Sequence, residues 1–210
     1  MRYERPCQQV GSGGFTYRYF GFIFYPPSPR YVNPVDLSNL RKLTDTQKNK
    51  AGVFVDATID HIHRIIEDAG LTYVQLHGNE TPGFCQEVRN TGISVIKAFR
   101  VDENFDFASI VKYSETVDFF LFDTKAEKPG GTGKKFNWKM LETYKLDTPF
   151  FLSGGIKPED AGQIIEFNHP QLHAIDLNSG FEDEPGLKNF EKLKQFLLHF
   201  QTLNFKQGKL

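Results

Sequence analysis

Acidic and glycine-rich segments follow short apolar runs in the second half of the chain. Asp123 comes directly after the run 119–122 and precedes the glycine-rich segment 130–134. A carboxyl group at the end of a buried strand, beside such a segment, can act as a general acid or a general base. The same residue can also be a helix cap or an ordinary loop acid, and its position alone does not separate these interpretations.

Two glycine-containing turns follow the last two apolar runs and have the composition of a phosphate site. Gly154 and Gly155 come after one run, and Ser179 and Gly180 come after the next. Glycine lets backbone N–H groups approach a phosphate closely. Either turn alone is weak support, but the two together predict a phosphate held between them.

Two further polar side chains follow strand-like runs nearer the N-terminus. Arg30 lies in the segment after the run 21–25, and an arginine there can bind a carboxylate through two parallel hydrogen bonds. His77 follows the run 73–76, although a lone histidine is more often structural than catalytic. Both residues are therefore candidates for a site at the ends of the strands.

The elements that must position these residues alternate between two patterns. Short runs that are apolar at consecutive positions indicate strands buried on both faces, as in a parallel sheet. These runs are 21–25, 52–55, 73–76, 95–99, 119–122, 150–152 and 174–177. Segments with apolar residues at helical spacing lie between them. The predicted helices are 57–69, 82–89, 137–144, 158–167 and 190–200.

This alternation predicts parallel strands joined by right-handed crossovers. Seven such units after residue 20 favour a closed barrel, with an open doubly wound sheet as the alternative. A (β/α)8 barrel typically needs about 200–250 residues, and the chain has 210. We therefore predict an α/β fold, a (β/α)8 TIM barrel whose first β/α unit is aberrant or missing. The expected organisation is an aberrant N-terminal segment, 1–20, followed by one barrel domain, 21–205.

Composition argues against several classes of partner. The 25 Lys and Arg nearly balance the 26 Asp and Glu, without the basic excess typical of nucleic-acid binding. The longest apolar run is far too short to span a bilayer. We therefore expect neither a nucleic-acid nor a membrane partner.

Cysteine and histidine usage argues against metal sites and disulfides. The two cysteines, Cys7 and Cys85, form no CxxC pair. His61 and His63 are two residues apart on a predicted helix and do not share a face. We expect no metal and no disulfide framework. The first residues also lack the apolar run of a signal peptide, so a cytoplasmic location is expected.

Several segments together resemble phosphoribosylanthranilate isomerase of tryptophan biosynthesis. They occur in family order over most of the chain after residue 20, and their combination is highly specific. The segments are GFIFY at 21–25, SPRY at 28–31, VQLHG at 74–78, LFDT at 121–124, GGTG at 130–133, LSGG at 152–155 and DLNSGFE at 176–182, with Pro185, Gly186 and Lys188. The resemblance implies a (β/α)8 barrel enzyme that catalyses an Amadori rearrangement without a cofactor.

The implied reaction converts N-(5′-phosphoribosyl)anthranilate to 1-(o-carboxyphenylamino)-1-deoxyribulose 5-phosphate. By resemblance, Asp123 is the general acid that protonates the ribose ring oxygen, and a cysteine base then removes the C2′ proton from the ring-opened Schiff base. The resemblance also implies a set of substrate-binding residues: Gly154, Gly155, Ser179 and Gly180 at the phosphate, Arg30 at the anthranilate carboxylate and His77 at the pocket rim. The expected partner is this phosphorylated small molecule, and the expected oligomeric state is a monomer or a homodimer.

The N-terminal segment departs from the family. The family cysteine belongs to a Lys-x-Cys-Gly-Met-type motif that ends the first strand, and this sequence contains no such motif. Cys7 has a similar ordinal position, but it has neither a preceding apolar run nor a following glycine. We therefore do not assign Cys7 as the base. Residues 1–20 are not expected to form a regular strand plus helix.

A shifted reading frame would account for this departure. If Met1, Arg2 and Tyr3 are encoded ATG-CGG-TAT, the same bases read one position later begin Cys-Gly, and the first base of the Glu4 codon completes Met. Codon freedom makes such a match easy to obtain, so this is a hypothesis. Under it, residues 1–20 are an out-of-frame translation and the true start lies upstream.

Other functions stay open at this level. Indole-glycerol-phosphate synthases typically carry catalytic lysines at inner strand ends, and Lys97 in the run 95–99 is the one candidate here. Isomerases of the histidine pathway use two aspartates, and the aberrant first unit removes the place to check one of them. A catalytically inactive, substrate-binding barrel would fit a chain that lacks the cysteine motif.

Overall fold

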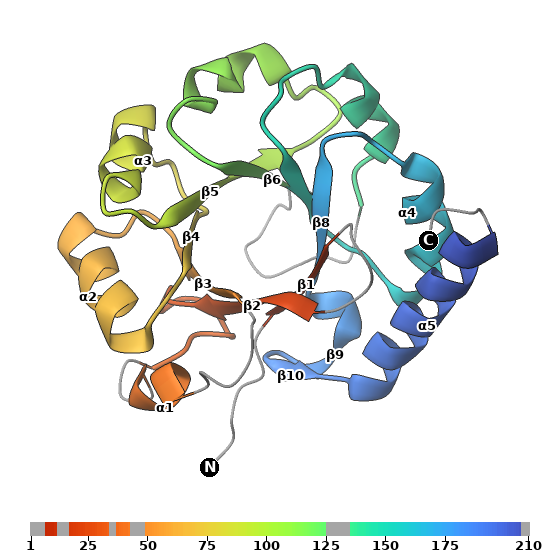
Figure 1. The fold of residues 1–210 in the computed structure, drawn as a ribbon, viewed down its shortest axis with the longest axis horizontal. Coiled ribbons are helices and arrows are strands. Elements are labelled where there is room, and N and C mark those ends of the chain that lie inside the picture. Colours follow the sequence, from red (N-terminus) through yellow and green to blue (C-terminus); the bar gives the residue numbers. More distant parts are fainter. Residues whose placement is uncertain (1–6, 12–16, 34–36, 43–48, 125–134, 207–210) are drawn as a thin grey trace.

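Eight strands close into a barrel, with the helices arranged around its outside (Figure 1). The computed structural model describes residues 7–11, 17–33, 37–42, 49–124 and 135–206. The barrel strands, in chain order and in order around the barrel, are β1 (Cys7–Gly11), β2 (Tyr17–Ile23), β3 (Asn49–Phe54), β4 (Tyr73–Leu76), β5 (Ser94–Val101), β6 (Phe119–Thr124), β7 (Phe150–Leu152) and β8 (Leu172–Leu177). A separate two-stranded sheet pairs β9 (Glu182–Glu184) with β10 (Leu187–Lys188).

The α-helices are α1 (Leu37–Lys42), α2 (Ile59–Ala69), α3 (Pro82–Arg89), α4 (Ala161–Phe167) and α5 (Phe190–Lys206). Short 3-10 helices are η2 (Phe107–Tyr113), η3 (Trp138–Thr143), η4 (Pro158–Asp160) and η5 (Ser179–Phe181). Thr58 caps the start of α2, and Gly70, in left-handed backbone, caps its end. Thr81 caps the start of α3, which has Pro82 in its first turn. None of the helices in the described part of the chain is long and apolar enough to cross a membrane.

Strands β2 to β8 run parallel, and every predicted apolar run lies in or overlaps one of them. This arrangement confirms the predicted α/β barrel. Strand β2 begins at Tyr17, before the predicted run 21–25. The residues before that run are mainly aromatic, and aromatic side chains favour strands even where an arginine interrupts the apolar pattern.

Strand β1 runs in the opposite direction to both of its neighbours. It pairs with β2, with Cys7 opposite Gly21, and with β8, with Gln8 opposite Leu177. Only residues 12–16 separate β1 from β2, whereas a parallel connection needs about a dozen residues or more. The first unit is therefore aberrant, as predicted. Because β1 is reversed, its first residue, Cys7, lies beside the carboxyl end of β8.

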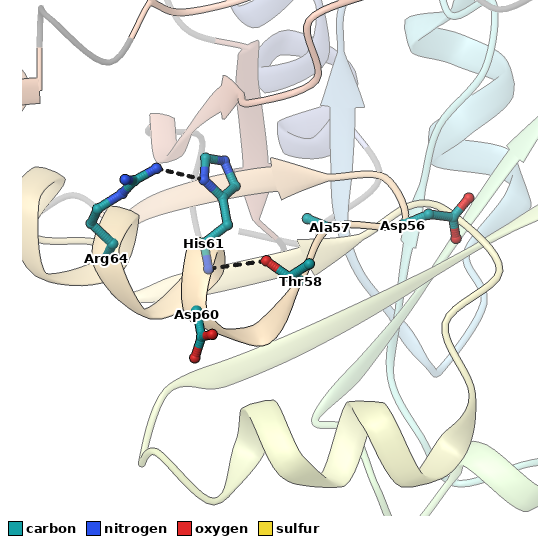
Figure 2. A pocket seen from close by; sticks show the side chains of 6 residues that line it. All are labelled: Asp56, Ala57, Thr58, Asp60, His61 and Arg64. Atoms are coloured by element: carbon teal, nitrogen blue, oxygen red, sulfur yellow. Dashed lines mark hydrogen bonds between the residues drawn. The ribbon is translucent and has the colours of Figure 1, made fainter.

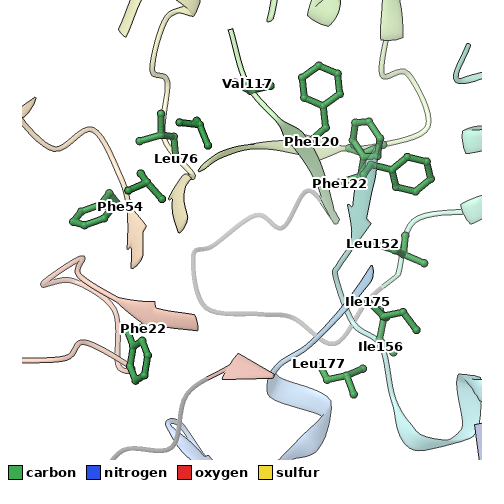
Figure 3. Close-up of a cluster of buried hydrophobic side chains, with 14 of the residues drawn as sticks. Phe22, Phe54, Leu76, Val117, Phe120, Phe122, Leu152, Ile156, Ile175 and Leu177 are labelled. Carbon is green, nitrogen blue, oxygen red and sulfur yellow. The ribbon is translucent and has the colours of Figure 1, made fainter. Parts of the chain in front are cut away.

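Two apolar layers hold the strands in place. The inner layer fills the barrel and consists of Tyr19, Ile96, Ala98, Leu121, Phe151 and Ala174. The outer layer lies between the strands and the helices, and part of it is drawn in Figure 3. Successive side chains of a strand face opposite sides. Since Leu121 belongs to the inner layer and Phe122 to the outer one, Asp123 is on the inner side.

Candidate active site

Asp123 and His77 meet across the mouth of the barrel, at the carboxyl ends of the parallel strands. Asp123 is on β6 and His77 directly follows β4, while β5 lies between these two strands. Nε2 of His77 is 3.4 Å from Oδ2 of Asp123. Side chains from strands that are not neighbours reach this distance on the inner side of the barrel. The structure therefore brings the predicted acid and the predicted rim residue together.

Gln75 sets which ring nitrogen of His77 carries the proton. The side-chain amide Nε2 of Gln75 donates a hydrogen bond of 2.9 Å to Nδ1 of His77. A neutral imidazole that accepts at one nitrogen carries its proton on the other. Nε2 is therefore the protonated nitrogen and faces Asp123. In this arrangement His77 can donate toward Asp123, but its Nε2 cannot accept a proton from a substrate.

Asp176 is a second carboxyl group of the mouth, and it is buried. It lies on β8 between Ile175 and Leu177, which both belong to the outer layer, so its own side chain is on the inner side. The hydroxyl of Ser153 donates a hydrogen bond of 3.0 Å to Oδ2 of Asp176. Oδ1 has no hydrogen-bond partner among the described residues. Sequence analysis did not single out Asp176, although an acid within an otherwise apolar run was an available signal.

The surroundings of Asp176 favour its protonated form. Burial raises the pKa of Asp176 above its ordinary value, and the neighbouring carboxyl of Asp123 raises it further. Lys188, the Ser153 hydrogen bond and His77 act in the opposite direction without cancelling that effect. Two acids in one mouth, of which one is buried, are an arrangement that can hold and transfer protons.

Arg30 is held by a carboxylate of the protein itself. Its Nε and Nη2 donate to Oε2 of Glu182 at 2.9 and 2.6 Å. Lys188 donates to Oε1 of Glu182 and to Oδ1 of Asn178, both at 2.9 Å. Burial acts to raise the pKa of Glu182, but the hydrogen bonds and charges of Arg30 and Lys188 hold that pKa below its usual range. Sequence analysis missed Glu182 as the partner of Arg30, since the two are 152 residues apart.

The two glycine turns lie against the end of β6 and against each other. A Cβ atom added at Gly154 would collide with the backbone nitrogen and side chain of Thr124, and one at Gly180 would collide with the carbonyl oxygen of Ile156. Gly154 and the glycine after it also have φ angles of 91° and 66°, which favour glycine. The structure therefore brings the two predicted phosphate-binding turns together.

The remaining predicted phosphate ligands belong to these same turns. Gly155 immediately precedes Ile156, whose carbonyl oxygen occupies the space that a Cβ atom at Gly180 would need. Ser179 is the first residue of η5, directly before Gly180. All four predicted residues thus lie after β7 and β8, where barrels commonly bind phosphate.

Lys97 lies outside the mouth. It is on β5 between Ile96 and Ala98, which face the inner layer, so it points to the helices, and it is 2% exposed. Its Nζ donates to Glu80 at 3.0 Å and to the carbonyl oxygens of Leu76, Gly78 and Ala98. The hypothesis that Lys97 is a catalytic lysine of a synthase is therefore wrong.

The described side chains place no thiol in the mouth. Cys85 is on α3, fully buried in the outer layer, and burial raises its pKa to about 11. The backbone of Cys7 begins β1, and its side chain is outside the described part of the chain. A thiol with a raised pKa and no exposure is a poor base.

An open pocket lies between the carboxyl end of β3 and the start of α2 (Figure 2). Its lining consists of Asp56, Ala57, Thr58, Asp60, His61 and Arg64. Arg64 donates to Nδ1 of His61 at 3.0 Å, and the backbone N–H of Asn79 donates to Asp56 at 2.6 Å. None of the predicted site residues lines this pocket. Within the described ranges, no three side chains of the metal-binding types come together.

A barrel of seven parallel strands and one reversed strand, with two acids in its mouth and glycine turns after its last two strands, has the architecture of the (β/α)8 barrel enzymes. Comparison with protein families gives a narrower assignment. The chain belongs to the N-(5′-phosphoribosyl)anthranilate isomerase family, whose family model matches residues 9–199.

Individual relatives agree with this assignment. The chain is 47% identical over 200 residues to N-(5′-phosphoribosyl)anthranilate isomerase of Parabacteroides distasonis, covering 94% of this chain and 89% of the relative. The solved phosphoribosyl anthranilate isomerase of Thermotoga maritima is 33% identical and superposes with a TM-score of 0.77 over 88% of both chains. A further solved isomerase, 30% identical with a TM-score of 0.74 over 88% of both chains, holds reduced 1-(o-carboxyphenylamino)-1-deoxyribulose 5-phosphate.

Proposed function

We propose that the barrel mouth catalyses the Amadori rearrangement of N-(5′-phosphoribosyl)anthranilate to 1-(o-carboxyphenylamino)-1-deoxyribulose 5-phosphate in tryptophan biosynthesis. The observation that carries this proposal is the contact of 3.4 Å between His77 and Asp123 across the mouth. It supplies an acid with a fixed hydrogen-bond donor beside two glycine turns suited to a phosphate. The isomerase relatives, one of which holds a reduced product, support the same reaction.

Asp123 acts first, as the general acid. It gives its proton to the ribose ring oxygen, the bond from that oxygen to C1′ breaks, and the bonding pair stays on oxygen. The lone pair of the anthranilate nitrogen forms the C1′–N double bond, which gives a protonated Schiff base. A placed acid of this kind contributes about 10²–10⁴-fold to a rate. His77 orients the Asp123 carboxyl through its Nε2 proton.

The rest of the mouth binds the two ends of the substrate. We assign the phosphate to the backbone of Gly154, Gly155, Ser179 and Gly180, the four residues of the two turns. Arg30 binds the anthranilate carboxylate, with its guanidinium held in one plane by Glu182. An arginine already fixed by a carboxylate loses less side-chain freedom when it binds a second one.

The proposal includes the setting of the reaction. Both chemical steps move protons within one substrate, so no cofactor enters them. The acting unit is a monomer or a homodimer, and a dimeric phosphoribosylanthranilate isomerase is known from Thermotoga maritima, 31% identical to this chain. A cytoplasmic, reducing location suits a sequence whose two cysteines form no CxxC pair.

The experiment is an isomerase assay on the purified chain. The enzyme is mixed with freshly made N-(5′-phosphoribosyl)anthranilate, and loss of the substrate's anthranilate fluorescence is followed. Binding of the reduced product is measured in parallel by calorimetry. Turnover together with binding supports the proposal. Binding without turnover identifies an inactive substrate-binding barrel, and absence of both overturns the assignment of the mouth.

A further inference from the structure

A buried ion pair, Lys97 with Glu80, holds the backbone of His77 in place. Nζ of Lys97 donates hydrogen bonds of 3.2 and 2.8 Å to the carbonyl oxygens of Leu76 and Gly78. These two residues flank His77 in the sequence. Glu80 accepts the backbone N–H of Gly78 and the ammonium of Lys97, each at 3.0 Å. Both peptide groups of His77 are therefore hydrogen-bonded to the same pair of charges.

The carboxylate of this pair also ties the segment to the loop that follows β3. Oε1 of Glu80 accepts the backbone N–H of Asp56 at 3.0 Å. Asp56 in turn accepts the backbone N–H of Asn79 at 2.6 Å, and it occupies the space that a Cβ atom at Gly78 would need. Asp56 also has a φ of 49°, a left-handed conformation that few residues other than glycine adopt. The loops after β3 and β4 are therefore locked to each other through Glu80.

The pair acts on the mouth from behind the barrel wall. The side chains of Lys97 and Glu80 are 2% and 3% exposed, so neither can meet a substrate. Lys97 belongs to β5, the strand between β4, which His77 follows, and β6, which carries Asp123. Its hydrogen bonds therefore fix the segment of His77 to the strand that pairs with the strand of Asp123.

We propose that Lys97 and Glu80 are positioning residues of the mouth, which set the contact between His77 and Asp123. This inference rests on the proposed function, in which His77 orients the carboxyl group of the acid. A misplacement of about 1 Å in a reacting site can cost about 10²-fold in rate. Loss of the pair should lower kcat and leave affinity for the reduced product nearly unchanged, because the phosphate turns and Arg30 follow other strands.

Lys97→Met is the first test, with Lys50→Met as its matched control. Lys50 is also a buried lysine whose Nζ donates to backbone carbonyl oxygens, those of Leu40 and Ala69. It lies near the start of β3, at the end of the barrel away from the mouth. Both variants should lose stability, but only Lys97→Met should lower kcat, by about 10–100-fold. An unchanged kcat in Lys97→Met, or an equal fall in both variants, would overturn the inference.

A double variant, Glu80→Gln with Lys97→Met, separates positioning from stability. Removing one member of a buried ion pair leaves the other charge without its partner, whereas removing both leaves no such charge. The double variant should therefore be more stable than Lys97→Met alone. Its kcat should stay as low, since the carbonyl oxygens on either side of His77 still lack their donor. Recovery of kcat together with stability would show that the pair only stabilises the fold.

His77→Ala tests whether the pair acts through His77. If it does, adding Lys97→Met to His77→Ala should cause no further fall in kcat, because the group that the pair positions is already gone. A fall by the same factor with and without His77 would contradict the inference.

Nitrogen NMR of the histidine rings gives a measurement that needs no turnover. Gln75 donates to Nδ1 of His77, so the chemical shifts of its ring nitrogens report the contacts that hold it. The signals are assigned by their loss in His77→Ala. They should move in Lys97→Met and stay in place in Lys50→Met. Unmoved signals in Lys97→Met overturn the inference even if the parent chain is active, whereas a parent chain with neither turnover nor binding of the reduced product overturns the proposed function.

Discussion

Arg30 and Glu182 join the two strands that flank β1. Arg30 follows β2 and Glu182 follows β8, and their side chains form a forked ion pair with a shortest N–O distance of 2.6 Å. Lys188, whose side chain is 1% exposed, contacts the other oxygen of Glu182. The strands on either side of the reversed β1 are therefore tied to each other by buried charges as well as by their backbone pairing with β1.

Glu182→Gln is predicted to destabilise the fold. The change leaves two cations, Arg30 and Lys188, without their carboxylate, and removing one partner of a buried ion pair costs about 3–5 kcal/mol. The measurement is the free energy of unfolding in urea. The lowered pKa of Glu182 makes its contribution present above the unfolded-state pKa and lost as pH falls through the folded-state pKa. The difference between variant and parent should therefore shrink in acid.

Asp183→Asn is the matched control for that prediction. Asp183 is adjacent in sequence, 54% exposed, and lies 3.8 Å from Lys192. An exposed ion pair contributes little to stability, so Asp183→Asn should change the free energy of unfolding by no more than about 0.5 kcal/mol. If Glu182→Gln and Asp183→Asn lowered the free energy of unfolding equally, the stabilising role assigned to the buried ion pairs of Glu182 would be wrong.

Gly154→Ala is predicted to weaken substrate binding and to lower stability. The added methyl group meets the backbone of Thr124, and the residue must also keep a φ of 91°. Gly92→Ala is the control, since Gly92 has a φ of 85° but open space around its Cβ position. In the control, the strain of a left-handed alanine should lower the free energy of unfolding by about 1–2 kcal/mol, and KM should stay unchanged. A raised KM for Gly154→Ala only would locate the phosphate turn.

Asp123→Asn is predicted to reduce kcat by about 10²–10⁴-fold with little change in affinity for the reduced product. The amide keeps the size of the side chain but cannot give a proton to the ring oxygen. Asp118→Asn provides a comparison at the opposite end of β6, where Asp118 binds Arg89 and the backbone of Val95. That variant should lose stability and keep kcat. Loss of kcat in both would mean that the assay reports folding and not acid catalysis.

The barrel could be predicted because its signals are local. Each parallel strand is a consecutive apolar run, and Asp123 stands at the end of one of them. The direction of β1 could not be predicted in the same way, since pairing depends on strands distant in the sequence. The short connection at 12–16 was the available signal for a hairpin. The out-of-frame hypothesis for residues 1–20 stays a prediction, which the nucleotide sequence tests.

The site was predicted less completely than the fold. Asp123, His77 and the two glycine turns follow strand ends, and the structure brings them to one mouth. Asp176 lies inside a run and not after it, so a search of strand ends passes over it. Its burial and its hydrogen bond from Ser153, which directly follows β7, exist only in the folded chain. Likewise, Arg30 suggested a carboxylate ligand, but only the folded chain supplies Glu182 as its partner.

Asp176 makes the stability of the fold depend on pH. Because burial raises its pKa in the folded state, the folded chain holds this proton at pH values where the unfolded chain has released it. The contribution of the protonated group is fully present below the unfolded-state value, near ~3.9. It is lost as pH rises through the higher folded-state pKa. Ionised Asp176 therefore lowers the stability of the parent at neutral pH.

Asp176→Asn removes this titration, since an amide does not ionise in that range. The free energy of unfolding of the variant, relative to the parent, should therefore increase as pH rises above about 4 and level off above the folded-state pKa of Asp176. Urea unfolding at a series of pH values measures this difference between variant and parent. Asp118→Asn is the comparison variant, because Asp118 forms an ion pair with Arg89. A difference that stays constant with pH would show that Asp176 titrates alike in both states. A rising difference would show that the folded barrel contains a buried acid that lowers its stability when it ionises.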